Sequence, residues 1–234
     1  MLMLACACVG QKEDPEDITP DGPSEPDTPA VVEGSCLVLD FTGTWCVNCP
    51  RMESAIEEAM EARPGLIIPV SVHCLNMDPM ALLPRSSQLA NDFGVTGYPS
   101  VVVDMNKESL FSATSSELLI SRCEASLSAR GKSAKVTVEK NGSTVTVSAK
   151  ITQKGNYTLH LLVVEDGIVA AQTGGSEQHV HNNVLRQWID AQATFDNCHK
   201  GDEIMFNTAL MMSEGQRLIG IARREGIVNG IAEY

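Results

Sequence analysis

Two cysteines separated by two residues are the part of this sequence most suited to chemistry. Cys46 and Cys49 follow the apolar run "LVLDFTG" and lead into a segment with helical spacing. Thiols at this spacing can form a redox-active disulfide, and the N-terminus of a helix stabilises a thiolate, which is the form that attacks disulfides. The pattern therefore indicates a redox dithiol in which Cys46 attacks and Cys49 resolves the mixed disulfide.

Two other interpretations of the cysteine pair stay open. One is half of a zinc site, which would need a second pair of ligands. His73 with Cys74, or Cys198 with His199, could be proposed, but neither repeats the Cys-x-x-Cys spacing, so no metal is predicted. The other is a purely structural pair of cysteines.

The elements that must position these cysteines alternate between strand and helix patterns. The stretches "CLVLDF" and "GLIIPVSVHC" are apolar enough for buried strands, and "CPRMESAIEEAMEA" between them has helical spacing. This order predicts a parallel β-α-β unit. We expect a short helix, an antiparallel pair of strands and a closing helix capped by Ser115 or Ser116 to follow, in the stretches SSQLANDFGV, PSVVVDM, ESLFSA and SSELLISRCEASLSAR.

After Gly131 the apolar pattern changes to period two, which is typical of strands with one buried face. The stretch "AKVTVEKNGSTVTVSAKI" predicts a hairpin that turns at Asn141 and Gly142. Further short strands separated by Gly, Asn and Asp indicate an antiparallel sandwich of immunoglobulin or fibronectin type. We therefore predict an α/β domain over residues 35–131 and a smaller all-β domain over residues 132–234.

Residues 36 to 130 resemble a thioredoxin-like domain. The resemblance rests on Asp40 six residues before Cys46, on Trp45, on the Cys-x-x-Cys pair, and on "GYPS" at residues 97–100 before the next strand. The sequence departs from that family in having Val-Asn between the cysteines in place of Gly-Pro, and Pro50 directly after Cys49. Because the middle dipeptide influences the redox potential, the choice between reductant, oxidant and isomerase stays open.

The resemblance implies roles for individual residues. Asp40 would move a proton at the resolving Cys49, and Pro99 would be cis and lie against the dithiol. Trp45 and Tyr98 would join Pro99 in binding the substrate. Protein thiols and disulfides are then the expected partners, and no cofactor is predicted.

The N-terminal residues predict a membrane anchor. The first eight, "MLMLACAC", are too short to span a bilayer and resemble the end of a signal peptide. Met3 to Cys6 resembles a bacterial lipoprotein cleavage box, with Cys8 as a second candidate for lipidation. We expect residues 1–8 to be this remnant, residues 9–34 to be a tether, and the protein to lie in the bacterial cell envelope on the periplasmic or surface face of the outer membrane. The competing interpretation is an unprocessed apolar N-terminus.

The net charge of −13 is concentrated in the predicted tether. Residues 11–33 carry eight acidic residues, one lysine and five prolines. Such a segment cannot bury enough apolar surface to offset the entropy lost on ordering, so we expect it to be solvated. The rest of the chain has no basic stripe, and nucleic acid is not an expected partner.

A histidine cluster in the second half has two interpretations. In "QHVHNNVLRQW", His179 and His181 point the same way if the segment is extended, which would suit a metal or ligand patch. The other interpretation is a polar turn before an element that buries Val184, Leu185 and Trp188. This stretch and "VVEDGIVAAQ" resemble the twenty-eight-kilodalton outer-membrane-protein family, lipoproteins that join a thioredoxin-like domain to a β-rich domain.

The remaining cysteines favour a structural interpretation. Cys36 and Cys74 flank strands that would be neighbours, and Cys123 lies in the closing helix, whereas Cys198 lies in a predicted loop. We expect free core thiols, with a bridge between Cys36 and Cys74 as the alternative.

Two functions from different classes follow from these patterns. The first is an exported, lipid-anchored thiol-disulfide oxidoreductase. The second is a surface binding or adhesin-type lipoprotein that uses the thioredoxin fold as a scaffold, a role implied by the family resemblance. The substrate and the oligomeric state are left open.

Overall fold

The structure, a computed structural model, describes residues 34–234. The predicted signal-peptide remnant, the lipidation site at Cys6 or Cys8 and the acidic tether up to residue 33 lie outside the described residues. Within the described part of the chain, no helix is both long and apolar enough to cross a membrane.

The first half of the folded chain follows the predicted alternation of strands and helices. Ser115 caps the closing helix, because its side chain accepts a hydrogen bond from the backbone N–H of Leu118 at 3.2 Å. The expected strand in "ESLFSA" is wrong: the segment forms a short 3-10 turn and a single bridge between Val101 and Phe111. The elements are β1 (Cys36–Thr42), α1 (Cys49–Ala62), β2 (Ile67–His73), α2 (Arg85–Phe93), β3 (Ser100–Val103), η1 (Lys107–Ser109) and α3 (Ser116–Arg130).

The second half consists of strands. The predicted hairpin is confirmed, with Asn141 paired to Thr144 across its turn and Gly142 at a φ of 61°. The strands are β4 (Lys135–Asn141), β5 (Thr144–Lys150), β6 (Gly155–Glu165), β7 (Ile168–Ala170), β8 (His179–His181), β9 (Val184–Asp190), β10 (Phe195–Cys198), β11 (Glu203–Ala209), β12 (Gln216–Arg224) and β13 (Ile227–Glu233).

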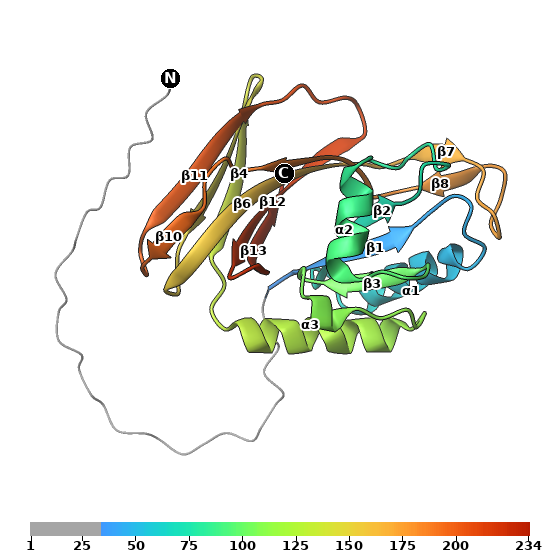
Figure 1. The fold of residues 1–234 in the computed structure, drawn as a ribbon, viewed down its shortest axis with the longest axis horizontal. Helices are drawn as coiled ribbons and strands as arrows, with labels where there is room; N and C mark the ends of the chain where they lie inside the picture. Colours follow the sequence, from blue (N-terminus) through green and yellow to red (C-terminus); the bar gives the residue numbers. More distant parts are fainter. Residues whose placement is uncertain (1–33) are drawn as a thin grey trace, which may run out of the picture. The chain divides into compact units, whose positions relative to one another are not determined.

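A single mixed sheet runs through both halves (Figure 1). Its order is β13-β12-β6-β9-β2-β1-β3, with β10 paired to β6 beside this path. The junction is a parallel pairing of β2 with β9 at Ser71 and Val184, where the backbone N–H of Ser71 donates to the carbonyl of Asn183 at 2.8 Å. The second half thus contributes a strand next to the strands that carry the predicted site.

Helices cover both faces of the β1–β2–β3 part of this sheet (Figure 1). Alternate residues of β1 point to opposite faces. Cys36 and Val38 pack with apolar residues of α1 and α3, whereas Leu37, Leu39 and Phe41 pack with α2. The second of these clusters also contains buried residues of the strands beyond β2, namely Leu162, Val164, Leu185, Ile219, Ile221 and Val228.

The β-rich half is completed by a second sheet of three strands in the order β11-β5-β4. Its residues Val145 and Val147 pack against Leu161, Val163 and Leu218 of the large sheet, and all five are fully buried. Two sheets packed face to face form the predicted sandwich.

The predicted fold class, a thioredoxin-like α/β part followed by a β-rich part, is therefore confirmed. The predicted boundary near residue 131 stays a prediction: α3 ends at Arg130, and residues 34–234 all belong to one compact unit.

Candidate active site

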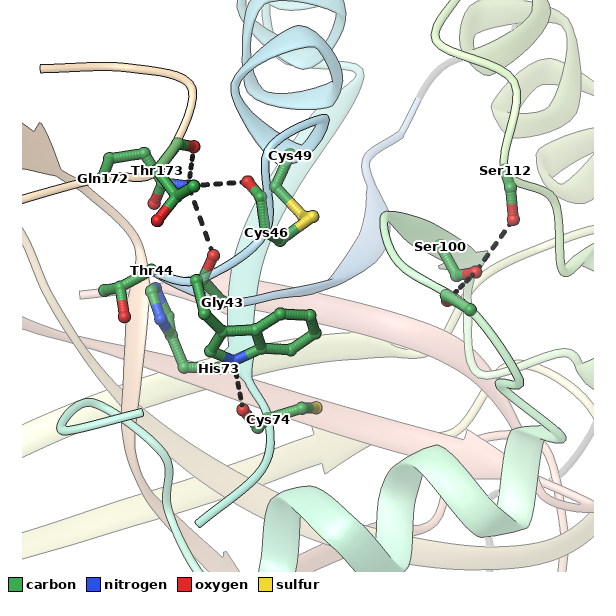
Figure 2. The surroundings of a disulfide bond; sticks show 12 residues. Gly43, Thr44, Cys46, Cys49, His73, Cys74, Ser100, Ser112, Gln172 and Thr173 are labelled. Carbon is green, nitrogen blue, oxygen red and sulfur yellow. Dashed lines mark hydrogen bonds between the residues drawn. A yellow bond between two sulfur atoms is a disulfide. The ribbon is translucent and has the colours of Figure 1, made fainter. Parts of the chain in front are cut away.

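Cys46 and Cys49 form a disulfide (Figure 2). Helix α1 begins at Cys49, so Cys46 lies in the turn that precedes the helix, three residues earlier than its first residue. The backbone N–H of Cys49 donates to the carbonyl of Cys46 at 3.4 Å. Both residues are buried, with 5% of Cys46 and 3% of Cys49 exposed, so little of the disulfide is accessible to a partner.

Asp40 lies on β1 with its side chain on the α1 face. The alternation along the strand requires this, because Val38 two residues earlier packs against the same helix. Asp40 is 3% exposed, and its Oδ1 atom has no hydrogen-bond partner. Burial, together with the nearby charge of Glu53, raises the pKa of Asp40 from 3.8 to about 8. A carboxyl with this pKa can exchange a proton with a cysteine thiol near neutral pH.

Trp45, Tyr98 and Pro99 lie around the disulfide on another side. The indole Nε1 of Trp45 donates to the carbonyl of Cys74 at 3.1 Å, and its ring meets that of Tyr98 edge-on with centroids 5.1 Å apart. The Tyr98–Pro99 peptide bond is cis. An open groove of about 370 Å³ runs beside this proline and is lined by Asn48, Arg51, Gly97, Tyr98, Pro99, Ser112 and Thr114.

The turn between β7 and β8 contacts the disulfide loop directly. The side-chain amide of Gln172 donates to the carbonyl of Cys46 at 2.9 Å and to that of Gly43 at 3.3 Å. The backbone N–H of Thr173 donates to the carbonyl of Thr44 at 2.8 Å. Figure 2 shows Gln172 and Thr173 beside Cys46, so part of the second half covers one flank of the disulfide.

Two histidines of β8 reach the same region. His179 Nε2 lies 2.8 Å from a carboxylate oxygen of Glu53 on α1, and the rings of His179 and His181 are 4.6 Å apart. His73 of β2 meets His181 edge-on with centroids 5.5 Å apart. Burial and the two neighbouring histidines lower the pKa of His181 to about 4, so this ring is neutral at physiological pH.

The structure agrees with part of each interpretation of the histidine cluster. His179 and His181 do face the same region, and Val184 and Leu185 are buried as the other interpretation expected, whereas Trp188 is only half-buried. Within residues 34–234, no grouping of three or more His, Cys, Asp or Glu side chains could hold a metal ion.

The other cysteines among residues 34–234 are all buried. Cys36, Cys74 and Cys123 are free thiols, as expected, and the Cys36 thiol donates to the carbonyl of Cys123 at 3.3 Å. Cys198 lies at the end of β10 and not in the predicted loop.

The structure brings every predicted site residue that it describes to one place. The residues of the disulfide, Asp40, Trp45, Tyr98 and Pro99 surround the same turn, while their roles stay predictions. Sequence reasoning missed Gln172 and Glu53, and only the paired histidines before β9 pointed to this part of the chain.

A thioredoxin-like fold with a Cys-x-x-Cys disulfide at the start of its first helix defines the class of protein. The thioredoxin family matches residues 29–120, and the family described as outer membrane protein Omp28 matches residues 86–213. The latter match spans more than half of the chain, and the protein belongs to the Omp28 family.

Three known proteins are similar to this chain in sequence or in fold. Protein disulfide isomerase-like 5-3 of Oryza sativa subsp. japonica is 30% identical over 74 residues, which are 32% of this chain and 16% of that protein. HBP35 of Porphyromonas gingivalis has a TM-score of 0.69 at 15% identity over 86% of this chain and 74% of its own. A protein of Agrobacterium tumefaciens has a TM-score of 0.67 at 12% identity over 86% and 94%. The two structures share the fold with this chain.

Proposed function

We propose that the protein is a thiol-disulfide oxidoreductase of the bacterial cell envelope. The observation that carries the proposal is a buried carboxyl, Asp40, beside the resolving Cys49 of a Cys-x-x-Cys disulfide. Burial holds the pKa of Asp40 near 8, which is close to that of a thiol. A structural disulfide has no use for a proton acceptor with such a pKa.

The proposed reaction conserves atoms and electrons. In the reduced protein the Cys46 thiolate attacks one sulfur of a substrate disulfide, forms a mixed disulfide and releases the other substrate sulfur as a thiolate. Cys49 then gives its proton to Asp40, attacks the sulfur of Cys46 and releases the second substrate sulfur. The substrate gains two electrons and the Cys46–Cys49 disulfide forms. A dithiol reductant restores the pair, and the reverse sequence oxidises a substrate dithiol.

The groove beside Pro99 supports a protein substrate. It is open, and Figure 2 shows Ser112 of its lining and Gln172 on opposite sides of the disulfide, so an extended segment could approach the sulfur atoms from this side. The similarity of 74 residues to a disulfide isomerase-like protein supports the same class of substrate. Protein thiols and disulfides are therefore the proposed partners.

Membership of an outer membrane protein family supports the proposed location. We propose a lipid attached to Cys6 or Cys8, with the acidic segment over residues 9–34 as the link to the folded part. Export would place the dithiol where substrate disulfides are abundant.

Turnover of a small aromatic disulfide with a dithiol reductant tests the activity. We expect Cys46→Ala to abolish turnover and Asp40→Asn to slow it by about a hundredfold, the usual range for losing a proton-transfer group. Cys123→Ala removes a buried free thiol away from the site and serves as the matched control, with turnover unchanged. A folded wild-type protein with a reducible disulfide but no exchange above a free-thiol control would refute the enzyme and favour the surface-binding alternative.

A further inference from the structure

A small cavity beside Cys49 is enclosed by β1, β2, α1 and the β7–β8 hairpin, which forms a separate two-stranded sheet. Its volume is about 20 Å³, and its lining includes Asp40, Cys49, Glu53, His73 and His181. Two buried atoms of this lining have no hydrogen-bond partner, Oδ1 of Asp40 and Nε2 of His181. The two residues are 3% and 5% exposed and come from distant parts of the chain, β1 and β8.

These two atoms and the size of the cavity suit one water molecule. A buried water needs about 10–15 Å³ and two or more polar partners. The ring of His181 also forms a hydrogen bond with the backbone of Ala170. Because that bond favours the charged form of the ring, the ring is its donor. The other ring nitrogen, Nε2, is then an acceptor without a partner. Water can then donate to both Nε2 of His181 and Oδ1 of Asp40. An unpartnered buried pair of this kind would otherwise destabilise the fold.

We propose that this cavity binds one water molecule between Asp40 and His181, and that His181 is a positioning residue for proton transfer at the dithiol. The binding site stands by itself, while the role in proton transfer rests on the proposed oxidoreductase function. The second half of the chain then contributes directly to the chemistry of the first.

Glu53 connects this cavity to solvent and can carry a proton between them. It lines the same cavity, its side chain is 32% exposed, and His179 holds one of its oxygens. Burial raises the pKa of Glu53, although the contact with His179 opposes the rise. A proton that Asp40 takes from Cys49 passes through the water to the Glu53 carboxylate and from there to bulk water. Each step breaks one O–H bond and forms another.

Several groups face Asp40 and contribute to its titration. Cys49 and Glu53 face it from α1, His73 from β2, and His181 from β8. Cys74, which follows β2, interacts with the charge of Asp40 and has a pKa raised to about 11, chiefly by burial. Among these groups, His181 supports the proposed water and Glu53 supplies a negative charge, so their removal has opposite effects on Asp40.

The test is an infrared titration of the protonated Asp40 carboxyl in the full chain, with the band assigned by its loss in Asp40→Asn. His181→Phe removes a partner of the water that stabilises ionised Asp40, so the acid dissociation constant of Asp40 should fall about three- to tenfold. Glu53→Gln removes a negative charge and should raise that constant about tenfold. Glu61→Gln makes the same charge change on α1 away from the cavity and should leave the constant unchanged. His181→Gln keeps a polar atom near the water and should restore most of the wild-type value.

A general structural disturbance would not shift one carboxyl in opposite directions. An Asp40 midpoint in His181→Phe equal to that of Glu61→Gln would overturn the proposal. If His181→Phe does not fold, a high-resolution crystal structure of the wild type decides, since an ordered water must lie about 3 Å from both atoms and its absence would overturn the site. Because the infrared measurement needs no turnover, its failure is distinguishable from failure of the oxidoreductase activity.

Discussion

The turn between β7 and β8 can be displaced from the disulfide by one methyl group. Gly174 has a φ of 79°, and a Cβ atom added there would lie 2.3 Å from the carbonyl oxygen of Val47. Because that neighbour is backbone, it cannot rotate away. We therefore expect Gly174→Ala to lift the turn from the disulfide loop.

The expected cost has two parts. Alanine at a positive φ costs about 1 kcal/mol relative to glycine. Lifting the turn also breaks the hydrogen bonds from Thr173 to Thr44 and from Gln172 to Cys46, at about 1 kcal/mol each. Gly174→Ala should therefore lower the free energy of unfolding by about 3 kcal/mol.

Gly167→Ala is the matched control. Gly167 has nearly the same φ, 77°, and no atom within 4 Å of an added Cβ. It should show the conformational cost alone, about 1 kcal/mol. Urea denaturation at equilibrium measures both variants.

Alkylation of the reduced protein gives a second, independent measurement. Once the turn has lifted, a short iodoacetamide pulse should label Cys46 faster in Gly174→Ala than in Gly167→Ala. Equal free energies of unfolding and equal labelling rates in the two variants would show that the turn does not cover the dithiol, and the argument from Gln172 would fail with it.

Three further predictions concern other parts of the molecule. Folding raises the pKa of Asp40 from 3.8 to about 8, so the stability that comes from its protonated form is fully present below pH 3.8 and is lost as the pH rises to about 8. Asp40→Asn should therefore raise the free energy of unfolding at pH 8 by several kcal/mol. It should also flatten the pH dependence of that free energy, as measured by urea denaturation. Arg130→Met should lower the free energy of unfolding by about 3–5 kcal/mol, because it leaves the buried carboxylate of Asp104 without the guanidinium that pairs with it. Expression with the native upstream sequence in a bacterial host should give an acylated protein in the membrane fraction that Cys6→Ser releases, and a soluble protein without an acyl group on Cys6 or Cys8 would contradict the anchor.

Local patterns were sufficient to predict much of the first half. The resemblance placed Asp40 near the resolving Cys49, and both residues line the same small cavity in the structure. The dipeptide Asn141-Gly142 predicted its hairpin for an equally local reason, since a tight turn requires a positive φ. These predictions depended on residues close together in the sequence.

The missed parts of the site depend on pairing between distant segments. Gln172 and Cys46 are 126 residues apart in the sequence, and the neighbouring pairing of β9 with β2 also joins distant segments, so no local periodicity encodes these partners. The error at "ESLFSA" has a local origin: the side chain of Ser109 accepts a hydrogen bond from the backbone N–H of Val103 at 2.8 Å within a 3-10 turn.

The core shared across the sheet has a thermodynamic consequence. Leu162 and Ile219 of the second half pack in the same cluster as Phe41 and Val72 of the first, so neither half can unfold without exposing apolar surface of the other. A cut at residue 131 would separate two sequence patterns but would divide one cooperative unit. Reducing the Cys46–Cys49 disulfide should therefore shift the melting of strands as distant as β13. By linkage, a partner of the β-rich half that binds the oxidised and reduced forms with different affinities must alter the reduction potential of the dithiol.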